Sequence, residues 1–115
     1  MPSSSATVTL TSGESLSTVA DLNSGVFGGI VLKTAWTTAA VSFQASVDNA
    51  SFYDLYYGGT EVNVPSGQAV ADRFVILSDG NWPVAARPGF RYMKVRSGLT
   101  GAPVGQAADR SILIG

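Results

Sequence analysis

Apolar and polar residues alternate along much of this chain, a pattern typical of strands that bury one face. Residues 6–11 alternate in this way, with Val8 and Leu10 on the inward side. The clearest case is the segment 41–47, in which four side chains are expected to point inward: Val41, Phe43, Ala45 and Val47. Both segments are therefore predicted to be half-buried strands.

Two other segments are apolar on both faces. Residues 30–32 read Ile-Val-Leu, and residues 73–77 run from Arg73 through Phe74 into a continuous apolar stretch. Such runs suit strands in the middle of a sheet that is covered on each side. We therefore expect the strand over 26–35, which contains the first run, to lie inside a sheet. The segment 73–77 is expected to be a strand with the ring of Phe74 in the core.

Turn residues separate the remaining strands. Asp48-Asn49 is expected to turn the chain, because Asx side chains bond their own backbone and tolerate a left-handed conformation. The aromatic segment 52–57 is expected to be one strand, joined by Gly58-Gly59 to a second strand at 60–64 as a hairpin.

The C-terminal part of the chain contains two further predicted strands, 90–96 and 111–114, with a loop expected at 97–105. In the first of them Met93 and Val95 are expected to face inward. Its other side chains are expected to face outward: Tyr92, Lys94 and Arg96.

These segments, with 15–22, amount to about eight or nine short strands, and no stretch has the spacing of an amphipathic helix. The pattern predicts an all-β fold, a single-domain antiparallel β-sandwich or a barrel. One domain is expected over residues 1–115, with 1–6 as an N-terminal arm and 78–89 as a long loop that carries Trp82.

The composition limits the chemistry. The chain has no cysteine and no histidine, so disulfides, thiolate metal sites and histidine-based catalysis are excluded. Charged residues make up 13% of the chain, with a formal net charge of −1. So few ions suit a subunit that is packed against neighbours, or a neutral secreted or engineered β protein. We expect no enzyme activity, no cofactor and no nucleic-acid partner.

The first residues show neither a basic start nor an apolar segment of the kind found in signal peptides. No apolar run approaches the roughly 18 residues that span a bilayer. Synthesis in a cytoplasm and the absence of a membrane partner are therefore expected.

The carboxylates are candidate catalytic or metal-binding groups, and the arginines are candidate ion-pair partners. Asp48, Asp54 and Glu61 lie near one another along the chain and could form a catalytic carboxylate pair. The turn role of Asp48 already explains that residue, and Asp54 suits either the surface or a cross-strand partner of a base. Arg96 and Arg110 are expected to form ion pairs at strand edges, each worth about 0 to 1 kcal/mol.

The aromatic residues leave three uses open, namely core, subunit interface and ligand contact, because tyrosine and tryptophan are frequent at interfaces. Tyr53 is one of the unsettled cases. The candidate interface or glycan contacts are Tyr56, Tyr57, Trp82 and Arg87.

Three segments together carry a family resemblance: 40–49, 52–56 and 91–98, with 110–114 at the end and 11–17 before the core strands. They resemble a family of small phage and prophage virion proteins with a jelly-roll or discoidin-like sandwich fold. The resemblance implies a capsid decoration (cement) protein on the outer shell, often a homotrimer, that clamps the major capsid protein. It places the protein in the virion, after synthesis in the host cytoplasm.

The same resemblance leaves an alternative. Related sandwiches in phage tails and fibres are carbohydrate-binding modules that bind host glycans, with loops at one end as the sugar site. The loop from Asp79 to Gly89 would be that site here.

Overall fold

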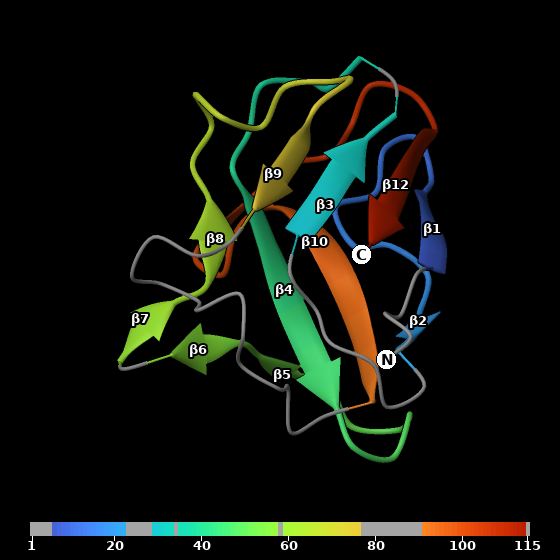
Figure 1. Ribbon diagram of the computed structural model, residues 1–115, viewed down its shortest axis with the longest axis vertical. Helices are drawn as coiled ribbons and strands as arrows, with labels where there is room; N and C mark the ends of the chain where they lie inside the picture. The colour runs from blue at the N-terminus through green and yellow to red at the C-terminus, as the bar shows by residue number, and fades with distance from the viewer. Residues whose placement is uncertain (1–5, 23–28, 34, 58, 77–90, 115) are drawn as a thin grey trace.

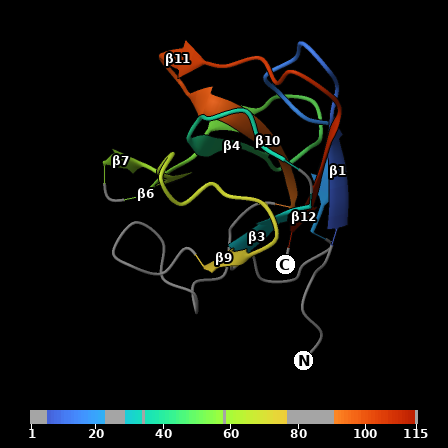
Figure 2. The same ribbon diagram turned by 90° about the horizontal axis from the view of Figure 1, so that it is seen from above.

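Two antiparallel β-sheets pack face to face in the computed structural model, which describes residues 6–22, 29–33, 35–57, 59–76 and 91–114 (Figures 1 and 2). No helix occurs within these ranges. The predicted all-β sandwich is therefore confirmed. The expected N-terminal arm, apart from Ala6, and the expected long loop at 78–89 lie outside the described residues.

The first sheet has four strands in the order β1, β12, β3, β9. Their bounds are β1 Ala6–Leu10, β12 Arg110–Ile114, β3 Gly29–Leu32 and β9 Phe74–Ile76. Val8 lies opposite Ile112, which in turn lies opposite Leu32, and all three side chains are buried. The alternation along β1 and β12 thus directs the apolar side chains of one face of this sheet toward the core.

The second sheet is built on β4, Val41–Ser46, and the long strand β10, Tyr92–Leu99. Four short strands extend it: β2 Ala20–Asp21 and β11 Ala102–Pro103 pair with β10, and β5 Tyr53–Asp54 and β8 Asn63–Val64 pair with β4. The strands β6, Tyr56–Tyr57, and β7, Thr60–Glu61, form a separate hairpin through Gly58-Gly59, as predicted.

The strand order is that of a jelly roll. If the short strands β5 to β8 are counted as one, and β11 as an extension of β10, the described residues form eight strands. The first sheet then contains strands one, eight, three and six, and the second contains two, seven, four and five. Each connection between consecutive core strands crosses between the sheets or closes a hairpin, as in two interlocked Greek keys.

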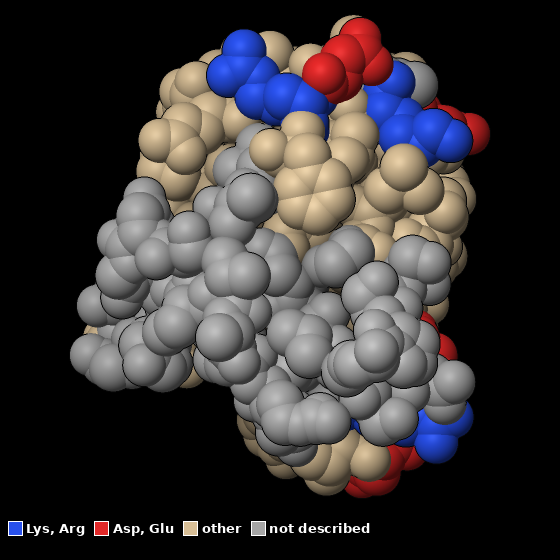
Figure 3. Space-filling view, viewed as in Figure 1, with Lys and Arg blue, Asp and Glu red and all other residues tan. Residues whose placement is uncertain are grey.

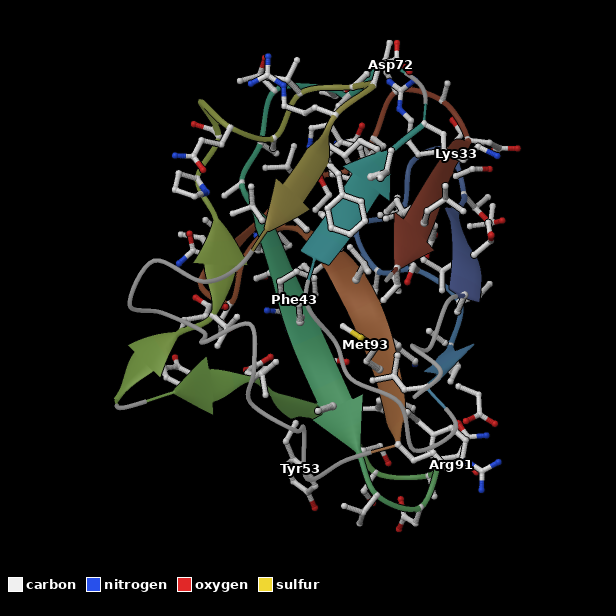
Figure 4. All side chains as sticks on the ribbon, in the orientation of Figure 1. Lys33, Phe43, Tyr53, Asp72, Arg91 and Met93 are labelled. Atoms are coloured by element: carbon white, nitrogen blue, oxygen red, sulfur yellow. The ribbon has the colours of Figure 1, made fainter. Side chains whose placement is uncertain are left out.

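The core lies between the two sheets. Leu32 and Ile112 of the first sheet and Phe43, Met93 and Val95 of the second are at most 1% exposed. Figure 4 shows Phe43 and Met93 on β4 and β10. Full burial of such a side chain stabilises the fold by about 1.5 to 3 kcal/mol.

The two sheets are joined along one side. The backbone N–H of Thr18 donates to the carbonyl of Thr9 at 3.0 Å, and the N–H of Thr9 donates to Oγ1 of Thr18 at 3.1 Å. Leu16 forms an isolated bridge with Arg96 of β10. The segment 15–22, predicted as one strand, is therefore a chain of short pairings that ties β1 to β10.

Gln106 fixes the loops at one end of the sandwich. Its side chain is 1% exposed, yet Oε1 accepts from the N–H of Thr37 and from Nε of Arg110, and Nε2 donates to the carbonyl of Thr37 and to Oγ of Ser97. The amide therefore makes four hydrogen bonds and connects the segment before β4 with β10 and β12. Arg110 bonds the amide of Gln106 and the hydroxyl of Thr37, and no ion pair of Arg110 occurs among the described residues of this chain.

Two expectations about burial were wrong. Val47, predicted to face inward, is 75% exposed, because β4 ends at Ser46 and the chain turns at once. Phe74, predicted to be in the core, is 56% exposed. It lies opposite Val31, whose neighbours Ile30 and Leu32 take the inward positions, so Phe74 falls on the outer face.

Two expected boundaries were also wrong. The aromatic segment 52–57 is broken at Leu55, whose N–H donates to the carbonyl of Phe43 at 3.0 Å, so it forms the two strands β5 and β6. The expected loop at 97–105 begins inside β10, which continues to Leu99 and turns back tightly into β11.

Candidate binding surfaces

Arg96 lies at the centre of a charged cluster on the outer face of the second sheet. Nη2 donates to Asp54, and Nη1 donates to Glu61 at 3.4 Å, to Thr100 at 2.9 Å and to Ser42 at 3.2 Å. The side chain of Arg96 points outward, as predicted, but it is only 9% exposed. The predicted ion pairing of Arg96 with neighbouring strands is confirmed, but Arg96 lies inside the sheet, opposite Ser42, and not at a strand edge.

Two carboxylates share this one guanidinium. Glu61 also accepts from the backbone N–H of Thr100 at 3.0 Å and from its hydroxyl at 2.6 Å. The hydrogen bond from Arg96 is the main cause that holds the pKa of Asp54 below its ordinary value. The cluster thus links β5, β7 and the turn after β10, with Oδ1 of Asp54 and Oε2 of Glu61 accepting from protein donors.

Asp48, the third carboxylate considered from the sequence, lies apart from this cluster. Its Oδ1 accepts from the hydroxyl of Ser46 at 2.9 Å and from the N–H groups of Ala50 and Ser51, while Asn49 has a positive φ of 60°. These hydrogen bonds lower the pKa of Asp48. The predicted turn role of Asp48 and Asn49 is confirmed, and the structure brings together only Asp54 and Glu61.

The sequence candidates for interface or glycan contact are partly described. Tyr56 is 53% exposed on β6, directly opposite Glu61 of β7. Tyr57 lies on β6 opposite Thr60, but its side chain is outside the described part of the structure, as are Trp82 and Arg87 altogether. Tyr53 is also exposed. The structure therefore does not test whether these residues form one surface.

Ionic and aromatic groups occupy the rest of the outer face of the second sheet. The ammonium of Lys94 lies 4.5 Å from the centre of the Phe52 ring. At the start of β10, Arg91 forms an ion pair with Asp21 at 2.8 Å and stacks on Tyr92 at 5.2 Å. This face is thus polar and charged across its width.

The outer face of the first sheet is different. Its outward row crosses all four strands, with Thr7 opposite Leu113, Leu113 opposite Val31 and Val31 opposite Phe74. We call this set of four residues the apolar row. Phe74 is 56% and Leu113 is 37% exposed, and Val31 is partly exposed. A continuous apolar row on a monomer surface marks a contact site more often than scattered exposed residues do.

Charged groups lie at the rim of this face. In Figure 3 the described surface over β9, β3 and β12 is mostly uncharged, and blue and red residues gather along its upper edge. Lys33 and Asp72 lie at that end of β3 and β9 in Figure 4. Among the described outward residues on these strands, next to the apolar row, are the hydroxyls of Thr9 and Ser111.

Sequence reasoning missed the apolar row, although a signal for it was present. The run 30–32 is predicted to lie in a strand whose two faces are both covered by protein, and Phe74 is predicted to lie in the core. The alternation along 111–114, which puts Leu113 on the side opposite Ile112 and Ile114, indicates an apolar residue on the outer face.

Within the described ranges, no group of three or more acidic side chains is placed to hold a metal ion. In the same ranges no helix is long and apolar enough to cross a membrane. A scan against models of protein families, a search of curated proteins and a search of solved structures find no match for this chain.

Proposed function

We propose that this protein is a structural component of a bacteriophage virion, a capsid decoration protein that stabilises the shell of the major capsid protein. It acts by docking and not by catalysis. The proposal rests on the resemblance of its strands to small phage proteins and on the jelly-roll strand order, an architecture used by viral capsid and lectin domains.

The observation that carries this proposal is the apolar row on an outer face that has few charges. Thr7, Leu113, Val31 and Phe74 cross the first sheet while the charges lie at its rim and on the opposite sheet. When a neighbouring protein covers an exposed row of this kind, the free energy falls by about 25 cal/mol for each Å² of apolar surface removed from water. A free monomer gains nothing from it, whereas a subunit of an assembly does.

The test is to locate the protein in purified particles and then remove it. Shells that lack it should leak their DNA at a lower temperature, and the added protein should restore the original temperature. Because apolar contact depends little on ionic screening, binding to shells should change little between low and moderate salt. Unchanged shells, or a steep dependence on salt, would contradict the proposal.

The proposal includes the location on the virion and the contact with the major capsid protein. It also includes a homo-oligomeric state, with a trimer favoured, and synthesis in the host cytoplasm. Imaging of decorated particles tests them together, because symmetry averaging would reveal how many copies meet at each position. Density at the tail alone would contradict the capsid location.

A second candidate is a carbohydrate-binding module of a phage tail or fibre that binds host glycans. It is favoured by the exposed ring of Tyr56, which lies beside the polar cluster of Glu61, Arg96 and Thr100. Sugar sites commonly combine an aromatic ring with hydrogen-bonding groups. Glycan-array signals that disappear in Tyr56→Ala, with an unchanged melting temperature, would support this function, and an array without signals would argue against it.

A further inference from the structure

The apolar row has its smallest side chain at one edge of the sheet and its largest at the other. It starts with the small side chain of Thr7 on β1, continues with the medium side chains of Leu113 and Val31, and ends with the large ring of Phe74 on β9. The four positions are in register across the sheet, so they lie on one line that crosses the strands.

We propose that this face packs against the same face of a second copy of the chain, about a twofold axis that runs along the strands between β12 and β3. This axis places Phe74 over Thr7 of the partner subunit and Leu113 over Val31 of the partner subunit. A large side chain then meets a small one, and two medium side chains meet each other. The facing pairs have similar total size along the row, as two closely packed sheets require.

The charges on this face agree with a second copy as the occupant. The described residues near the row at one end of the face include two cations, Lys33 and Arg73, and the carboxylate of Asp72. The backbone N–H of Lys33 donates to the carbonyl of Ser111. The same axis places Lys33 over Ser111 of the partner subunit, so no like charges lie directly opposite each other. A face with so little charge offers a strongly charged partner no electrostatic gain.

The size of the face predicts a weak pair. Four strands of about five residues, about 4.8 Å apart, cover roughly 300 Å² in projection. A standard stable interface buries about 800 Å² on each partner. Pairing is therefore expected where copies are concentrated, as on an assembled shell. In this respect the inference rests on the proposed function: the neighbour that covers the apolar row is another copy of this chain, and the contact with the shell is made by a different surface.

Sedimentation equilibrium of the full chain tests the pairing. The average mass should rise from the 11.9 kDa monomer toward twice that value as the concentration increases from about 10 µM to about 1 mM. Leu113→Lys, which puts a charge in the middle of the row, should remain monomeric. Val47→Lys, at an exposed position on the turn after β4, is the matched control and should behave as the wild type. A wild type that is monomeric throughout, or an unaffected Leu113→Lys, overturns the inference.

Cross-linking tests the axis itself. The chain has no cysteine, and Thr7 and Phe74 are separated by three strand spacings, about 14 Å, which is too far for a disulfide within one chain. Facing sheets lie about 10 Å apart, so the reagent is a bifunctional thiol cross-linker too short to span the roughly 14 Å within one chain. With it, the double variant Thr7→Cys with Phe74→Cys should form closed covalent dimers, and each single variant should not. Equal cross-linking of the single variants, or covalent trimers and larger species, overturns the twofold arrangement.

The two proposals fail separately. A protein that is found on particles but never pairs in solution would refute the pairing and leave the virion role intact. A protein that pairs as described but is absent from particles would refute the virion role and leave the pairing intact.

Discussion

Nη1 of Arg96 lies 3.4 Å from Oε2 of Glu61, so that a central strand of the second sheet holds the β6–β7 hairpin through two largely buried charges. The same guanidinium also binds Asp54. One side chain of β10 thus holds the two neighbouring strands β5 and β7, which lie far from it in sequence.

Substitution of Arg96 should destabilise the fold strongly. Arg96→Met leaves Asp54 and Glu61 without their cation in a partly buried place, which should reduce the free energy of unfolding by about 3 to 5 kcal/mol. Urea denaturation followed by tryptophan fluorescence measures this change. Arg91→Met, which breaks an exposed ion pair, is the control and should leave the midpoint almost unchanged.

If the cause is the loss of charge compensation, neutralising the carboxylates should restore part of the stability. The triple variant Arg96→Met, Asp54→Asn, Glu61→Gln should therefore be more stable than Arg96→Met alone. Equal stability of these two variants would mean that Arg96 acts through packing of its stem.

The stability of the protein should fall in acid, in part through Asp54. Because Arg96 lowers the pKa of Asp54 in the folded state below its ordinary value of 3.8, the contribution of this carboxylate is complete above that value. It is lost as the pH falls through the lower, folded-state pKa. The slope of unfolding free energy against pH, measured from pH 5 downward to about pH 2, should be smaller in Asp54→Asn. An equal slope in both proteins would contradict the assignment.

Gly98 is required for the turn from β10 into β11. Its φ is 96°, and a Cβ there would lie 2.8 Å from Cα of Pro103 and from the backbone nitrogen of Val104. Gly98→Ala should therefore lower the free energy of unfolding by about 1 to 3 kcal/mol. Gly101→Ala, three residues further on in the same turn region with open space around it, should be close to neutral. Similar losses in both variants would contradict this explanation.

Truncation of two phenylalanines should change the free energy of unfolding by very different amounts. Phe43→Ala empties a fully buried position between the sheets and should cost about 3 to 5 kcal/mol. Phe74→Ala removes an outward ring and should change the stability of the monomer by about 0.5 kcal/mol or less. Thermal or urea unfolding at low protein concentration separates the two, and a large loss in Phe74→Ala would place that ring in the core after all.

The elements that could be predicted from the sequence are those with strict alternation. Residues 41–47 and 111–114 gave β4 and β12 nearly to their ends, because a period of two assigns each side chain to a face. Phe74 was assigned to the wrong face because a continuous apolar run carries no such period. Its face is set by pairing with Val31, a contact between positions far apart in the chain.

The charged cluster shows the same limit. The alternation of residues 90–96 correctly predicts that Arg96 points away from the core, but its side chain is not exposed to solvent. The segment from β5 to β7 covers it, and nothing local to Arg96 indicates this. Likewise the suggestion that Asp54 pairs with a base is confirmed, but the identity of the base, and the arrival of Glu61 at the same guanidinium, follow only from the fold.

Ala6 and Ile114 lie opposite each other in adjacent strands, although almost the whole described chain separates them. A peptide fused before β1 and one fused after β12 would therefore leave the molecule from the same corner. A short linker between these two points would join them with little strain, so new chain ends could be opened at the Asp48-Asn49 turn. The two ends of the described chain are therefore adjacent, and a cargo protein could be fused at that corner of the first sheet.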